Sequence, residues 1–258
     1  MSETKPKQEH PLANILINVL IPVMVLSYLS KDPEIQEKLG KAVKPWHIGP
    51  LKAMILALVL PFAYGIWHFL KTRKGNIFSA LGFVSVLLTG GLTLYLWNAD
   101  GTVKPNAGLL FGIKEALIPL VLAIAILISH RSANPLIRVF LYNDSIFDIP
   151  KIEGRVKERD AADGYDRLLL FATRLFAGSF LLSSAMNLGL ALWFFRSFEA
   201  GALDALEKYN RIVGQLTGWS FAVIGLPVLL ILFLILTRLI RGLRELTGLD
   251  DKELLLPR

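Results

Sequence analysis

The chain has 258 residues, of which 53% are hydrophobic and 19% charged, and it carries a formal net charge of +7. This apolar composition excludes an ordinary soluble domain. The lack of cysteine excludes a disulfide framework and a cysteine-based metal site. Basic residues facing anionic lipid explain the positive charge better than a nucleic-acid partner does.

Six apolar stretches are each about long enough to cross a hydrocarbon core of roughly 30 Å as a helix. They cover residues 12–30, 51–70, 76–97, 109–129, 168–195 and 218–240. This pattern predicts an all-α fold, a polytopic bundle of six transmembrane helices forming one transmembrane domain. Asn14 and Asn18 interrupt the first stretch, and a poor cleavage site follows it, which favours a retained helix over a signal peptide.

The distribution of basic residues predicts which loops stay in the cytoplasm. The short loop with Lys71, Arg73 and Lys74 contains no acid, and such loops remain on the inner side. Both termini and residues 130–167 are then cytoplasmic. Within that connector, which we do not expect to be an independent domain, 134–142 suits a short interfacial helix. Residues 151–167 are dense in both charge signs and suit a solvated segment.

Four prolines fall inside the predicted spans and are expected to kink them, because each removes a backbone hydrogen bond: Pro22, Pro61, Pro119 and Pro227. The segment 18–22 resembles the segment 115–119, and both end in Leu-Ile-Pro. The two spans run in opposite directions, so the likeness suggests two three-helix inverted repeats, a common plan of transporters. Chance similarity in leucine-rich sequence is the alternative.

Charged residues inside the spans are the candidate functional residues. Lys114 and Glu115 lie in the fourth span and Arg174 in the fifth. A charge near the bilayer centre costs at least roughly 2.5–3.5 kcal/mol, so such groups usually face a bundle interior or a wet cavity. One hypothesis is a substrate pathway lined by these three residues with Asn18 and Asn187. The alternative is that the cations extend to the membrane surface, Glu115 pairs locally, and the amides bond neighbouring helices.

Other chemistry is not indicated by the sequence. The histidines lie at or near the termini or span ends without an i, i+4 pair, so no metal site is expected. No phosphate loop, nucleophile elbow, dinucleotide fingerprint or paired-carboxylate motif occurs. We therefore expect neither a cofactor nor an enzymatic activity.

Four segments carry a family resemblance: the Gly90-Gly91-Leu92-Thr93-Leu94 helix, Lys114, residues 120–129, and Asn134-Pro135-Leu136-Ile137-Arg138. In this order they resemble the intracellular septation protein A family of bacterial inner-membrane proteins. A related, longer group of proteobacterial membrane proteins, some labelled as transporters, is similar over most of the chain. That likeness includes Asn18, Pro22, Tyr64 and Leu216-Thr217-Gly218-Trp219-Ser220. The chain departs from the septation family in its sixth span and its 130–167 insert.

The resemblance implies a bacterial inner-membrane location and work linked to the cell envelope, and it supplies no catalytic residues. Two functions follow as hypotheses. The first is a small transporter or flippase-like protein for a small or lipidic substrate, an anionic one included. The second is a non-enzymatic scaffold that binds envelope-synthesis or septation proteins through 130–167. Membrane lipids are expected partners, and the lipid-facing surface leaves room for a homodimer.

Overall fold

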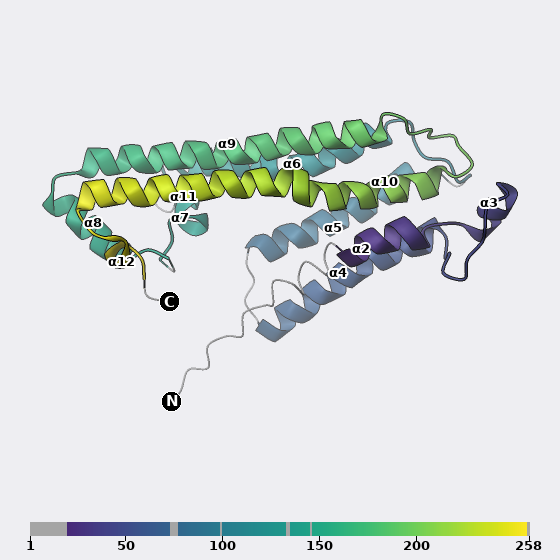
Figure 1. Ribbon diagram of the computed structural model, residues 1–258, viewed down its shortest axis with the longest axis horizontal. Coiled ribbons are helices and arrows are strands. Elements are labelled where there is room, and N and C mark those ends of the chain that lie inside the picture. The colour runs from purple at the N-terminus through teal and green to yellow at the C-terminus, as the bar shows by residue number, and fades with distance from the viewer. Residues whose placement is uncertain (1–19, 73–76, 99, 133–134, 145, 257–258) are drawn as a thin grey trace. The chain divides into compact units, whose positions relative to one another are not determined.

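The computed structural model describes residues 20–72, 77–98, 100–132, 135–144 and 146–256, and this part of the chain is helical apart from loops and two isolated β-bridges (Figure 1). The longer helices are α4 (Pro50–Thr72), α5 (Ile77–Leu96), α6 (Ala107–Ser129), α9 (Ala162–Phe195), α10 (Ala205–Ser220) and α11 (Leu226–Thr247). Shorter ones are α2 (Ile21–Met24), α3 (Pro33–Lys38), α7 (Leu136–Phe140), α8 (Ile149–Glu158) and α12 (Asp251–Leu254), with π-helices η2 (Val25–Leu29) and η3 (Phe221–Gly225).

Four helical segments within the described residues are long and apolar enough to cross a membrane. They are Pro50–Trp67, Ala107–Ser129, Ala162–Phe195 and Ala205–Thr247. They contain or overlap the second, fourth, fifth and sixth predicted spans, which supports a helical membrane protein. Helix α5 covers most of the third predicted span, and α2 with η2 covers the end of the first. Six crossings therefore stay a prediction.

The four prolines occupy two different settings. Pro61 and Pro119 lie inside the unbroken helices α4 and α6. Pro22 and Pro227 lie at the starts of α2 and α11, where α-helical and π-helical turns adjoin. Pro227 lies within the continuous helical segment Ala205–Thr247, directly after η3. A proline inside a helix removes a backbone hydrogen bond, and a π-helical turn beside it is one way for the helix to accommodate that loss.

The chain divides into two compact units. Unit 1 comprises residues 1–114 and 188–222, and unit 2 comprises 115–187 and 223–258. The division does not follow two successive three-helix halves, so the inverted repeat also stays a prediction. In unit 1, α2 and η2 pack against α4 and α10. Gly214 permits this approach, since a Cβ there would lie 3.2 Å from the Cβ of Leu26.

Unit 2 contains an apolar core that joins the predicted connector to the C-terminal segment. The α8 residues Ile152 and Val156 are buried with Leu243 of α11 and Leu254 of α12. The backbone N–H of Asp148 donates to the carbonyl of Leu254 at 3.0 Å, and that of Leu256 donates to Ile146 at 2.9 Å.

The sequence predicts a solvated segment over 151–167, but the structure differs there. Helix α8 begins after Asp148, whose carboxylate accepts the N–H of Lys151, and it buries one face while its charged residues stay outside. The many charged residues lie on the outer face of an amphipathic helix, and they gave no indication of the apolar face that α8 buries.

Candidate functional site

Lys114 is the predicted pathway residue with the most enclosed setting. Its side chain is only 7% exposed on α6, within a helix that is otherwise long and apolar. The ammonium donates to the Thr89 hydroxyl of α5 at 2.7 Å and lies 4.9 Å from the centre of the Phe111 ring. A cation in this position is therefore stabilised by a hydroxyl dipole and by an aromatic face.

The other predicted pathway residues lie in different surroundings. Glu115 is half-buried, and Arg174 is exposed on α9. Asn187 donates to the Ser183 carbonyl of its own helix at 2.8 Å. Asn18 lies outside the described residues. The pathway as a whole therefore stays a prediction.

A buried polar network in unit 1 was missed by the sequence analysis. Asn210 of α10 is completely buried and donates to the Ser30 hydroxyl at 2.6 Å and to the Pro50 carbonyl at 2.8 Å. One helical turn away, the Glu207 carboxylate accepts from the Gln36 amide at 2.6 Å. These bonds connect α10 to residues 30–36 and to the start of α4, both of which are distant from it in sequence.

A signal for this network did exist in the sequence. Residues 196–217 connect the fifth and sixth predicted spans, and within them Ala205, Tyr209, Val213 and Leu216 recur at helical spacing. All four are buried in α10. Recognising that helix would have placed Glu207 and Asn210 close to its buried face.

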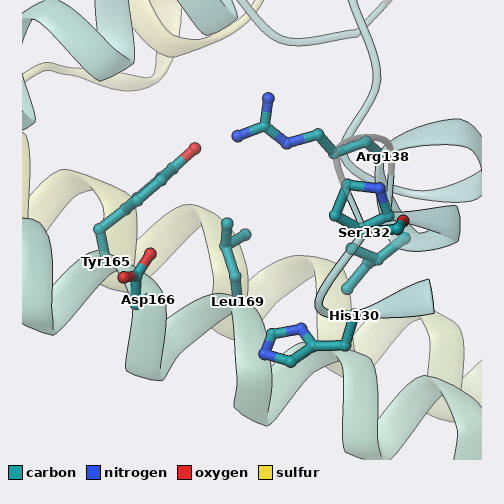
Figure 2. A pocket seen from close by; sticks show the side chains of 8 residues that line it. His130, Ser132, Arg138, Tyr165, Asp166 and Leu169 are labelled. Carbon is teal, nitrogen blue, oxygen red and sulfur yellow. The ribbon is translucent and has the colours of Figure 1, made fainter. Parts of the chain in front are cut away.

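A pocket of about 320 Å³ lies in unit 2, between the C-terminal end of α6 and the start of α9 (Figure 2). Its polar lining consists of His130, Ser132, Arg138, Tyr165 and Asp166. The apolar lining comes from Pro135, Ile137 and Leu169. In Figure 2 the Arg138 guanidinium extends toward the Tyr165 hydroxyl, with Asp166 and Leu169 on the same helix as Tyr165. The pocket thus presents both charge signs beside an apolar surface.

The wall of this pocket is held by a tyrosine pair and an ion pair. Tyr165 donates its hydroxyl to that of Tyr142 at 3.2 Å, and Tyr142 packs on Phe147 with ring centres 5.0 Å apart. Burial raises the pKa of the Tyr142 hydroxyl well above its usual range, so this hydroxyl stays protonated. Arg138 donates to the Glu153 carboxylate at 2.7 Å, which fixes the guanidinium at the pocket rim.

Within the described residues, no group of three or more His, Asp or Glu side chains is arranged to hold a metal ion. The arrangement is instead suited to binding by charge and shape. Together, the fold and these sites define a helical protein with helices long and apolar enough to cross a membrane, buried polar groups in one unit and a charged pocket in the other. No protein-family model, curated protein or solved structure matches this chain.

Proposed function

We propose that this chain is a multi-pass bacterial inner-membrane protein with six spans and both termini in the cytoplasm. We propose further that it moves a small or lipidic substrate across the membrane, in the manner of a small transporter or flippase. Likeness between the segments 18–22 and 115–119 is the support for an inverted repeat in this bundle.

Burial of Lys114 is the observation that carries this proposal. A charged group inside a membrane-crossing helix is expensive, and it usually marks a polar path through the protein. The Lys114 ammonium points to the Thr89 hydroxyl of a neighbouring helix rather than to the exposed surface. A cation there can transiently neutralise the phosphate or carboxylate of a passing substrate.

The first experiment measures lipid movement directly. The chain is reconstituted into vesicles of phosphatidylethanolamine and phosphatidylglycerol that carry a trace of NBD-labelled phosphatidylethanolamine, and dithionite is added outside. We expect the wild-type protein to expose inner-leaflet probe to bleaching, and Lys114→Met to reduce the rate at least about tenfold, because the path loses its cation. Lys52→Met, at an exposed lysine in the same unit, is the matched control and should retain the wild-type rate.

A second experiment covers substrates other than lipids. Since the chain has no cysteine, Thr89→Cys can be tested with a membrane-impermeant thiol reagent. Labelling of this cysteine is expected if water reaches the Lys114 region, whereas Ala57→Cys, at a 3% exposed site on α4, should stay protected. Equal protection of both cysteines, together with no lipid movement by the wild-type protein, would contradict the transport proposal.

The second candidate function is a scaffold for envelope-synthesis or septation proteins, and the ordered connector favours it. Helix α8 is anchored by its buried face and presents the charged residues Lys151, Glu153 and Lys157 outward. A protein partner would then be recognised by charge complementarity. Reversing the charges of Lys151 and Lys157 should abolish partner capture by a scaffold and leave lipid movement by a transporter unchanged.

A further inference from the structure

We propose that the unit 2 pocket binds a zwitterionic head group, a phosphodiester joined to a primary ammonium, as in phosphatidylethanolamine. Arg138 would hold the phosphate and Asp166 the ammonium, while Leu169 would contact the adjoining apolar part. This site concerns binding at the membrane surface and does not require that the protein transports anything.

The position of the pocket along the chain places it at the level of lipid head groups. His130 follows directly on α6, whose membrane-crossing segment ends at Ser129. Leu169, on the apolar side of the pocket, is the second residue of the predicted fifth span. If the fifth span begins at residue 168, as the sequence predicts, both elements pass from hydrocarbon to water beside this pocket, where a lipid presents its phosphate.

Arg138 is arranged to receive a phosphate. Its ion pair with Glu153 uses one N–H of a group that carries five, and the guanidinium extends across the pocket toward Tyr165 (Figure 2). The remaining N–H groups match the geometry of phosphate oxygens. The His130 imidazole lines the same pocket and adds a donor for the phosphodiester or glycerol oxygens. The Ser132 hydroxyl, which also lines the pocket, donates to the Ser129 carbonyl at 2.7 Å.

The two carboxylates of this region select for a ligand that also carries a positive charge. Asp166 lines the pocket from α9, and Glu153 holds Arg138 from the other side. A purely anionic head group would gain from Arg138 but meet repulsion from these acids, whereas a cation alone would meet repulsion from Arg138. A volume of about 320 Å³ lies at the lower end of the range for small-molecule sites and suits a head group.

The test measures binding and not flux, so its failure can be told apart from failure of the transport proposal. The full chain is purified in detergent, stripped of lipid and titrated in native mass spectrometry with phosphatidylethanolamine, phosphatidylglycerol or glycerophosphoethanolamine. We expect the wild-type protein to bind phosphatidylethanolamine about tenfold more tightly than phosphatidylglycerol, the effect of one favourable charge contact of moderate strength. Competition by glycerophosphoethanolamine would assign recognition to the head group alone, and binding of the acylated form only would assign it to a lipid.

Asp166→Asn is the deciding variant, because Asp166 forms no ion pair recorded among the described residues and its loss should not disturb the fold. We expect it to remove the preference for phosphatidylethanolamine, while Asp163→Asn, one turn earlier on the exposed surface of α9, keeps it. Arg138→Gln should weaken binding of both lipids, and Arg155→Gln, at an arginine of α8 outside the pocket, should not. Equal affinity of the wild-type protein for the two lipids, or an unchanged preference in Asp166→Asn, would overturn the proposal.

Discussion

The two units bury polar side chains in different ways. In unit 1 the buried Asn210, Glu207 and Lys114 form hydrogen bonds to residues on other elements. In unit 2 the buried hydroxyls of Thr173 and Thr247 donate to carbonyls one turn earlier on their own helices. Two contacts of unit 2 are exceptions: Ser184 of α9 donates to the Ala116 carbonyl of α6, and Tyr165 donates to the Tyr142 hydroxyl.

This difference indicates what holds each unit together. A hydroxyl that hydrogen-bonds within its own helix is satisfied in every packing arrangement of that helix, so the bond favours none of them. A buried amide or carboxylate bonded across elements is satisfied in one arrangement alone, and any other arrangement leaves it unpaired. Unit 1 thus derives specificity from polar contacts, whereas the connector and C-terminal segment of unit 2 depend on apolar burial.

The largest expected effect concerns the apolar core of unit 2. Ile152 of α8 is completely buried, so Ile152→Ala should destabilise the protein by about 2–5 kcal/mol through lost burial and a cavity. Hydrogen exchange of the purified protein should show faster exchange over 146–158 and 250–256. Lys157→Ala, on the exposed face of the same helix, is the control. Unchanged protection in Ile152→Ala would mean that the connector does not depend on this core.

A smaller effect is expected at the polar network of unit 1. Asn210→Ala removes two hydrogen bonds and leaves the Ser30 hydroxyl and the Pro50 carbonyl without this donor. Its expected cost is about 1–3 kcal/mol in the free energy of unfolding, measured by SDS titration in detergent micelles. Thr173→Ala, the matched change in unit 2, should cost less than about 1 kcal/mol because its bond is local. Equal costs would erase the contrast between the units.

The smallest effect is a pH dependence at His47, a buried residue of the loop that connects α3 to α4, which accepts the Lys44 N–H at 3.2 Å. Burial, with Lys31 and Lys44 nearby, lowers the pKa of this imidazole. The unfolded chain therefore takes up the proton first as the pH falls, and stability present above about pH 6.5 is lost below it. His47→Asn retains an acceptor without titrating, so its stability should decrease less than that of the wild-type protein between about pH 7.5 and pH 5.5. The same decrease in both proteins would exclude His47 as the cause.

The sequence predicts features best where a signal is continuous along the chain and worst where residues that are far apart in the chain interact. Apolar helices of membrane-crossing length at 109–129 and 168–195 could be predicted because runs of apolar residues act locally. The buried setting of Lys114 could be anticipated only as one of two alternatives, since a helix has both an inner and an outer face. Arg174, also a cation within a predicted span, is exposed on α9 instead.

The sequence by itself determined that this protein is helical and has apolar runs suited to a membrane. A backbone in hydrocarbon must satisfy its own hydrogen bonds, and an apolar run long enough to cross the membrane does so as a helix. Tertiary structure alone decided that α8 and α12 share a core, that Asn210 meets Ser30 and Pro50, and that Arg138 and Asp166 line one pocket. These residues are far apart in the chain, and only packing selects which of many possible partners each one contacts.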